Sequence, residues 1–377
     1  MRVSSIICLL LFSFPGLLSA EEKKCLIPGV NFESIYTGEI FSKLSGGINN
    51  NKGAEYRGNF DFTAALDTEN AGLWHGGFFY VYFENTHGEG ISNEYVGDIQ
   101  LLSNIDAHDF SQISEYIIYQ SFMNDRLLLK LGKQDGNNDF NMTETAVEFI
   151  NSSFGIMPNV LLPTFPDNAL GAATFISIKE NFSVSAGIFD GNGKGGKSGF
   201  DTAFNSDAVS VSVIETLIGY APSRRGNLKL GVWRHGGTWQ YMTSAKSKHQ
   251  NTGAYIIIEQ GILVEKESDK FCLDSFFQYG YADININKIP NYIGAGLRAQ
   301  CLIPKRPDDS IGIGFASTGI NQDISGMKTE TAIEAYYLAK FKEVLIIQPD
   351  IQYIINPGGT GNSAFVMGAR FYLNFGF

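Results

Sequence analysis

The sequence predicts an all-β protein: a transmembrane antiparallel up-and-down β-barrel of about 16 strands, with short periplasmic turns and long extracellular loops. Three observations predict this fold. Apolar and polar residues alternate in many segments of strand length. Charged residues stand in the middle of these segments, on the polar face. Short and long connections between these segments alternate along the chain.

The alternation is clearest at the end of the chain, in "AFVMGARFYLNFGF". One face of this segment carries Phe365, Met367, Ala369, Phe371, Leu373, Phe375 and Phe377, and the other carries Gly368, Arg370, Tyr372 and Asn374. The segments "ETAIEAYYLAKF", "VLIIQPDIQYII" and "RLLLKLGKQD" repeat the pattern, with mid-strand charged or amide residues opposite an apolar row. This arrangement is expected for a wall with lipid outside and water inside.

A soluble β-sandwich would show the same alternation, so the connections decide between the two folds. Short connections lie near residues 124, 180, 225, 306 and 343. Between them lie the long connections 84–111, 133–170, 189–212 and 235–250, then "ASTGINQDISGMKTE" and "NPGGTGNS". An outer-membrane barrel has this order of loops, and strands of roughly 9–11 residues cross the bilayer when tilted. Closure of the barrel pairs every backbone group in lipid.

The first residues, "MRVSSIICLLLFSFPGLLSA", combine a basic residue, an apolar run broken by Pro15 and small residues before a charged stretch. This order is typical of a secretory signal peptide cleaved near Ala20. We therefore expect residues 1–20 to be the signal peptide and residues 21–377 to form a single barrel in the outer membrane of a Gram-negative cell. No other segment of the sequence has the roughly 20 continuous apolar residues of a transmembrane helix.

The composition excludes one large class of partners. The formal net charge is −11, and an acidic chain without a basic tract argues against nucleic-acid binding. Cys25, Cys272 and Cys301 follow the signal peptide. Alternation places Cys272 and Cys301 on opposite faces of two adjacent predicted strands, which disfavours a disulfide without excluding one that uses a bulge.

The run "GIFDGNGKGGKSG" matches the sequence motif of a phosphate-binding loop from Gly191 to Ser198. Such a loop binds phosphate where a helix begins at its Lys-Ser end, and no periodic helical pattern follows here. ATP is also not expected where an exported protein works. The run therefore predicts a Gly-rich surface loop.

Several stretches resemble the carbohydrate-selective porins of the OprB type. They are "GLWHGGFFYVYFENTHGEGIS" with "VGDIQLLSNIDA", "LKLGKQDGNNDF" with "EFINSSFGIMP", and "EAYYLAKF" through "LIIQPDIQYIINPGG" to the aromatic end. The resemblance covers most of the chain, in the expected order. It implies a 16-stranded barrel through which sugars diffuse, narrowed by a long loop that folds inward. Residues 133–170 are the candidate for this constriction loop.

A passage for sugars should offer carboxylate, amide and guanidinium partners beside aromatic surfaces, with binding weak enough for release. The candidates on the predicted strands are Arg57, Asp61, Lys130, Asp274, Gln278, Arg298, Glu334, Tyr336, Asp350, Gln352 and Arg370. The candidates in the loop are Asp135, Asp139, Phe140 and Glu148.

Five of the aromatic and charged residues have more specific predictions. Phe140 and Tyr336 are expected to stack on sugar rings. Asp350 and Arg370 would set a transverse field if they lie near each other across the last hairpin. Phe377 resembles the terminal aromatic residue by which outer-membrane proteins are presented to the barrel-assembly machinery.

The predicted function is passive, carbohydrate-selective diffusion through a polar, water-filled channel surrounded by outer-membrane lipid. The alternatives are a general diffusion porin without sugar preference and a surface receptor or adhesin that uses the long loops. An enzyme is disfavoured because the histidines have no metal-like spacing and no hydrolase elbow is present. We expect no cofactor and no metal. The sequence leaves open which sugar passes and whether the barrel is monomeric or trimeric.

Overall fold

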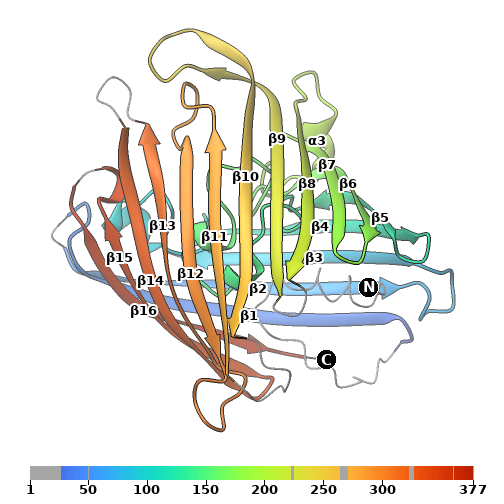
Figure 1. The fold of residues 1–377 in the computed structure, drawn as a ribbon, viewed down its shortest axis with the longest axis horizontal. Coiled ribbons are helices and arrows are strands. Elements are labelled where there is room, and N and C mark those ends of the chain that lie inside the picture. Colours follow the sequence, from blue (N-terminus) through green and yellow to red (C-terminus); the bar gives the residue numbers. More distant parts are fainter. Residues whose placement is uncertain are drawn as a thin grey trace.

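The computed structural model describes residues 27–49, 51–221, 225–263, 271–321, 327–359 and 361–376. Within these ranges sixteen strands form one closed antiparallel barrel, in which each strand pairs with its sequence neighbours and β1 pairs with β16 (Figure 1). The predicted fold class is therefore confirmed. A closed sheet has no edge strand, so the backbone groups of every strand are paired where the barrel meets lipid.

The strands are β1 (Val30–Ser45), β2 (Gly53–Asp67), β3 (Gly77–Gly88), β4 (Phe110–Phe122), β5 (Leu127–Gln134), β6 (Ala169–Lys179), β7 (Phe182–Asp190), β8 (Ser210–Ala221), β9 (Gly226–Gln240), β10 (Ser247–Leu263), β11 (Cys272–Ala282), β12 (Asn291–Gln300), β13 (Ser310–Asn321), β14 (Met327–Phe341), β15 (Leu345–Ile355) and β16 (Ala364–Asn374). Short helical turns are η1 (Ser92–Val96), η2 (Glu144–Ala146), α2 (Ser152–Gly155), α3 (Phe200–Ala203) and η5 (Pro357–Gly359). None of the helices in the described ranges is long and apolar enough to cross a membrane.

The faces of the sheet are inverted relative to a soluble sandwich. On β15, Ile351 is 43% exposed, whereas its neighbours Asp350 and Gln352 are 2% and 1% exposed. Ile333 and Leu131 likewise face outward beside the buried side chains of Glu334 and Lys130. Apolar residues outside and polar residues inside are the pattern of a barrel wall in lipid.

The long connections gather at one end of the barrel, where the β9–β10 hairpin and α3 project in Figure 1. Two of them are shorter than expected. Residues 235–250 are mostly strand, because the β9–β10 ladder continues to Gln240 and Ser247. The polar segment after residue 315 also continues as strand, to Asn321 on β13. Where the strands extend past the membrane, both of their faces can be polar, so the sequence there has the composition of a loop. The hydrogen bonds between neighbouring strands nevertheless keep these residues extended.

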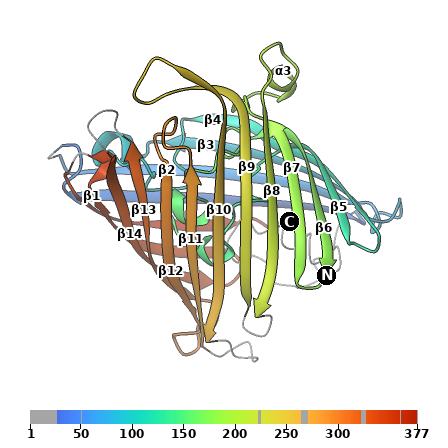
Figure 2. The same cartoon turned by 45° about the horizontal axis from the view of Figure 1, so that its top comes forward.

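Two long connections turn into the barrel: residues 89–109, the first inner loop, and residues 135–168, the second inner loop. Figures 1 and 2 show the green chain that follows β5 inside the ring of strands. The buried apolar cluster includes Leu102 of the first inner loop and Phe149 and Phe154 of the second, with Phe276 and Tyr336 of the wall. The core therefore lies in the lumen, between the inner loops and one side of the barrel.

The Gly-rich run lies in the connection between β7 and β8, as expected for a loop. The single turn α3 does follow it, which the sequence did not predict. The N–H groups of Gly195 and Gly196 donate to Asp167 Oδ1 at 2.6 Å and to Gln112 Oε1 at 2.5 Å. These amides thus hold loops together and do not form a phosphate cradle.

The remaining sequence predictions concern the cysteines and the chain ends. Cys272 lies opposite Gln300 in the register, one residue before Cys301, and no disulfide joins the two cysteines. The predicted signal peptide, Cys25 and the terminal Phe377 lie outside the described residues.

Candidate functional site

The second inner loop is fixed to the barrel by a buried carboxylate, Glu148. Arg298 on β12 donates to it from Nε at 2.8 Å and from Nη2 at 2.6 Å. Ser310 Oγ and Tyr336 Oη donate to Glu148 Oε2 at 2.6 and 2.9 Å. Burial alone would raise the pKa of Glu148, but the Arg298 guanidinium and these hydrogen bonds bring the pKa below its usual value. Glu148 is therefore an ionised anchor at neutral pH.

Wall carboxylates also hold the backbone of the second inner loop. Glu334 on β14 accepts hydrogen bonds from the N–H groups of Ile150 and Asn151 at 2.6 and 2.9 Å. Glu259 on β10 accepts from Thr145 N–H at 2.6 Å, and Glu215 on β8 accepts from Asn141 N–H at 3.1 Å. Buried backbone groups need such partners, and the loop has no sheet of its own to supply them. We call strands β8–β15 the anchoring wall.

The first inner loop is held in the same manner. Glu330 on β14 accepts hydrogen bonds from Ile99 N–H at Oε2 and from Gln100 N–H at Oε1, each at 3.0 Å. Arg370 on β16 donates from Nη2 to Ser103 Oγ at 2.9 Å. The two inner loops also bond to each other, since Asn104 N–H donates to Ile150 C=O at 2.8 Å. From the sequence, only residues 133–170 were predicted to fold inward, so the first inner loop is an addition to that prediction.

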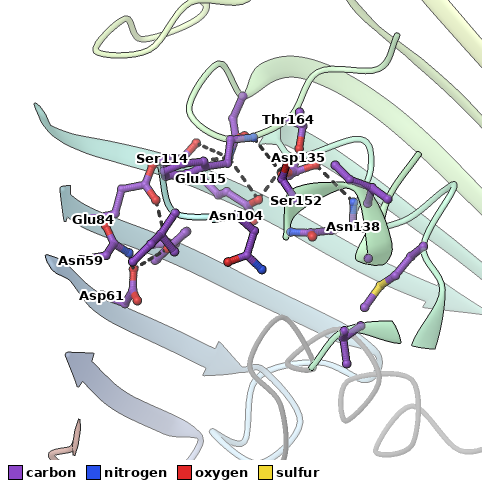
Figure 3. Close-up of a pocket in the computed structure, with 18 of the residues that line it drawn as sticks. Asn59, Asp61, Glu84, Asn104, Ser114, Glu115, Asp135, Asn138, Ser152 and Thr164 are labelled. Atoms are coloured by element: carbon purple, nitrogen blue, oxygen red, sulfur yellow. Dashed lines mark hydrogen bonds between the residues drawn. The ribbon is translucent and has the colours of Figure 1, made fainter. Parts of the chain in front are cut away.

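Opposite the anchoring wall, a cavity of about 390 Å³ lies between parts of the inner loops and strands β16 and β1–β5, which we call the cavity wall. Figure 3 shows Asn59, Asp61 and Glu84 on the cavity wall and Asp135, Asn138 and Ser152 on the second inner loop. The volume lies within the range of about 300–1,000 Å³ typical of small-molecule sites. The cavity therefore lies on one side of the barrel lumen.

A row of aromatic residues follows strand β3 along this cavity. Phe78, Tyr80 and Tyr82 all line it, two residues apart on the same face of the strand. Tyr119 on β4 extends the row, with its ring 5.7 Å from that of Phe78 in an edge-on contact. Aromatic faces beside polar groups suit a solute that has both apolar ring faces and hydroxyl groups.

Carboxylates outnumber basic groups among the described residues that line the cavity. The carboxylates are Asp61, Glu84, Asp106, Glu115, Asp135 and Asp139, and the basic residues are Lys130 and Arg370. Lys130 Nζ lies 2.6 Å from Asp139 Oδ2, and Arg370 Nη2 lies 2.7 Å from Glu39 Oε2. Burial raises the pKa of Asp135 to about 6, although hydrogen bonds from Phe165 N–H and the Thr164 hydroxyl favour its ionised form.

Comparison with known proteins decides the family. The profile of the carbohydrate-selective porin, OprB family, matches residues 51–375. This chain belongs to that family. It is an outer-membrane β-barrel channel through which carbohydrates diffuse.

Individual relatives agree with this assignment. The porin is 20% identical to Porin B of Pseudomonas aeruginosa over 403 residues, which covers 93% of this chain and 88% of the relative. The high-pH structure of Pseudomonas putida OprB is similar with a TM-score of 0.82 and 21% identity, covering 92% of this chain and 94% of that one. The outer-membrane channel DcaP of Acinetobacter baumannii has a TM-score of 0.55 and 11% identity, covering 95% and 100%. At these identities, the two structures support the fold.

Most of the predicted site residues of the porin fall into two groups: those that line the cavity and those that fix the second inner loop to the barrel. Those that line the cavity are Asp61, Lys130, Asp135, Asp139 and Arg370. Those that fix the second inner loop are Glu148, Gln278, Arg298, Glu334, Tyr336 and Gln352. Arg57 contacts Asp106 of the first inner loop at 3.3 Å, and Asp274 pairs with Arg225 at 2.8 Å beside a short turn.

Two predictions about aromatic residues are wrong for this structure. Phe140 is fully buried, with its ring 5.9 Å from Phe175 and 6.2 Å from Phe189. Tyr336 is 3% exposed, because Glu148 and the ring of Phe149 cover it. Both side chains pack the loop against the wall of the porin, so neither presents a free ring to a sugar.

Asp350 and Arg370 lie diagonally across the last hairpin, as the condition for a transverse field requires, and their charges interact without a direct ion pair. Asp350 lies opposite Gly368 in the β15–β16 register, whereas Arg370 lies opposite Gln348. Arg370 pairs instead with Glu39 on β1, which is its direct neighbour across the closure of the barrel. The sequence gives no sign of this contact because 331 residues separate the two.

Several residues that line the cavity were not predicted from the sequence, including Tyr80, Tyr82, Glu84 and Glu115. The segment "GFFYVYFEN" contains alternating aromatic residues, but both of its faces are apolar near the middle. The position of Glu84 on the face of Tyr80 and Tyr82 was the signal that could have identified the lumen side of this strand.

Proposed function

We propose that neutral monosaccharides cross this porin through the cavity between the inner loops and the cavity wall, and that residues 133–170 act as its constriction loop. The attachment of the second inner loop to the anchoring wall supports this proposal, because it leaves the cavity as the polar route past the loop. Substrate binding there is weak, as conduction requires.

The chemistry of the cavity suits an uncharged sugar. The rings of Tyr80 and Tyr82 offer surfaces to the apolar faces of a pyranose. Side-chain amides, hydroxyls and carboxylates, including Asn59, Asn104 and Asn138, offer partners to its hydroxyl groups. A solute that can use both kinds of group should cross faster than one of equal size that can use neither.

We infer that the chain moves solutes without chemical change. The two basic side chains that line the cavity among the described residues, Lys130 and Arg370, are paired with Asp139 and Glu39. We further propose that residues 1–20 are a cleaved signal peptide, that residues 21–377 are one barrel domain and that Phe377 is the signal read by the barrel-assembly machinery.

Liposome swelling with the refolded protein tests the proposal. Uncharged sugars would be compared with amino acids of similar size and with graded oligosaccharides. Faster entry of sugars than of size-matched amino acids is the expected result. Entry that depends on size alone would indicate a general diffusion porin, and no entry would favour a surface receptor or adhesin.

Replacing Tyr80 with alanine is expected to slow monosaccharide entry about three- to tenfold, the range expected for loss of one aromatic stacking contact. The matched control is Val81→Ala on the same strand, because Val81 is 42% exposed on the outer face. Swelling rates for glucose and for a size-matched amino acid give the measurement. Equally faster entry of both solutes in Tyr80→Ala would show that the ring sets only the width of the passage.

A further inference from the structure

Two carboxylates face each other in the cavity wall, and no cation in the part of the chain that the structure describes donates a hydrogen bond to either of them. Asp61 on β2 and Glu84 on β3 are direct neighbours in the antiparallel register, and both line the cavity (Figure 3). They are 2% and 1% exposed. Like charges directly opposite each other destabilise a sheet, so this arrangement needs a compensating partner.

The hydrogen-bond donors around Asp61 and Glu84 do not supply a hydrogen to each of the four carboxylate oxygens. The Tyr82 hydroxyl lies 2.6 Å from Asp61 Oδ1 and 3.1 Å from Glu84 Oε2, but a hydroxyl has one hydrogen to donate. Asn59 donates to the same Asp61 oxygen at 2.7 Å. The other oxygen, Asp61 Oδ2, is buried and has no hydrogen-bond partner in the part of the chain that the structure describes.

Every hydrogen-bond donor to this pair among the described residues is neutral, and the Lys133 ammonium acts on Glu84 only through space. Gln112 and Ser114 each donate to Glu84 Oε1 at 2.7 Å. Lys133, which lies on β5, donates instead to the carbonyl oxygens of Ile113 and Lys197 at 3.1 and 2.9 Å. The pair differs in this respect from Asp139, whose carboxylate is matched by Lys130 at 2.6 Å.

We propose that Asp61 and Glu84 form a subsite for the ammonium group of an amino sugar, and that the channel passes such sugars in preference to neutral ones of the same size. This inference rests on the proposed function, because it assigns a substrate class to the same cavity. A protonated primary amine carries three N–H donors and a positive charge. It can therefore donate hydrogen bonds to both carboxylates and compensate their negative charges.

The position of the pair also suits the rest of the sugar. Tyr80 and Tyr82 lie on the same face of β3 as Glu84 and line the same cavity. With its amine at the carboxylates, a pyranose ring can contact the aromatic row. A sugar acid or sugar phosphate would meet the same carboxylates with the wrong charge and should be rejected.

Block of the ionic current through single channels in planar bilayers at neutral pH and low salt tests the inference. The probes are glucosamine, glucose, N-acetylglucosamine, glucuronate and ethanolamine. Glucosamine is expected to block at concentrations about tenfold lower than glucose, the effect of a hydrogen bond between charged groups. The advantage should shrink in concentrated salt, which screens charge.

Variants localise the effect. In Asp61→Asn combined with Glu84→Gln, the ratio of glucose to glucosamine blocking concentrations should fall to about one, since both replacements remove charge at nearly constant shape. The matched control is Asp201→Asn, which removes a charge from an exposed loop and should keep the ratio of the unmodified protein. If the double variant does not insert, the comparison of probes on the unmodified channel still decides the question.

Equal block by glucosamine and glucose would overturn the inference, and glucose entry in the swelling assay would then still support the proposed function. Block by ethanolamine as strong as that by glucosamine would overturn the assignment to a sugar. If neither sugar blocks or enters, the proposed function itself is wrong.

Discussion

Replacing Glu148 with glutamine is expected to release the second inner loop from the anchoring wall and to widen the channel. The change keeps the shape of the side chain but leaves the Arg298 guanidinium without its charged partner in a site where the two side chains are 19% and 2% exposed. Breaking such a buried pair costs about 3–5 kcal/mol. The barrel ladder is untouched, so the cost falls on the loop. Single-channel conductance and the largest oligosaccharide that enters liposomes should both increase.

A double-mutant cycle separates the ion pair from the rest of the anchor. Arg298→Met alone should act in the same direction, because it leaves a buried carboxylate without its guanidinium, while the hydroxyls of Ser310 and Tyr336 still donate to it. The double variant should recover part of the loss, since an apolar pair avoids an unpaired buried charge. Lys248→Met, which removes a more exposed ion pair with Asp283, is the matched control and should leave conductance unchanged. Unmodified conductance in Glu148→Gln would show that the loop does not depend on this anchor.

Replacing Arg370 with methionine is expected to lower the free energy of unfolding of the barrel by about 3–5 kcal/mol, the cost of leaving a buried carboxylate unpaired. Arg370 and Glu39 are direct neighbours between the last and first strands and are 3% and 5% exposed as side chains. Their contacts of 2.8 Å from Nε and 2.7 Å from Nη2 therefore lie on the seam that closes the barrel. The first inner loop would also lose the bond from Arg370 to Ser103.

Urea-induced unfolding of the refolded protein in detergent micelles, followed by tryptophan fluorescence, gives this measurement. The Glu39→Gln variant should lose stability as well, and the combination with Arg370→Met should lose less than the two single effects added together. Lys248→Met serves again as the control. A midpoint of Arg370→Met equal to that of the unmodified protein would mean that the backbone ladder alone sets the stability of the closure.

The two experiments probe different properties because the lumen of this porin has two kinds of polar contact. Glu148 with Arg298 connects a loop to the wall, so its loss should change what passes. Glu39 with Arg370 connects two strands, so its loss should change how firmly the barrel closes. A variant of each pair measured in both assays would show whether loop position and barrel stability are separable.

Much of the fold could be predicted because lipid imposes a strict period on the strands. Ile351 between Asp350 and Gln352, and Leu131 beside Lys130, show in the sequence which face meets lipid. Strand ends were predicted less well. Beyond the lipid belt both faces of β9 and β10 are polar, so residues near His235 and His249 resemble loop although their backbones are paired.

The site was predicted only in part because alternation identifies the lumen but not what fills it. Asp61 and Arg298 were both assigned to the lumen, yet one lines the cavity and the other anchors a loop. Phe140 was placed correctly in the second inner loop, but its ring packs on Phe175 and Phe189. A loop without periodic structure gives no sequence signal for which side chains face water.

The sequence by itself determined that this chain is a closed barrel of alternating strands, because each strand must be apolar toward lipid and can be polar only inside. Its motifs also determined the family. Only the tertiary structure decided which wall the inner loops occupy, which residues border the remaining cavity, and that Asp61 faces Glu84 while Arg370 meets Glu39. These contacts depend on strand register, barrel closure and hydrogen bonds between distant segments, and local residue patterns do not specify any of the three.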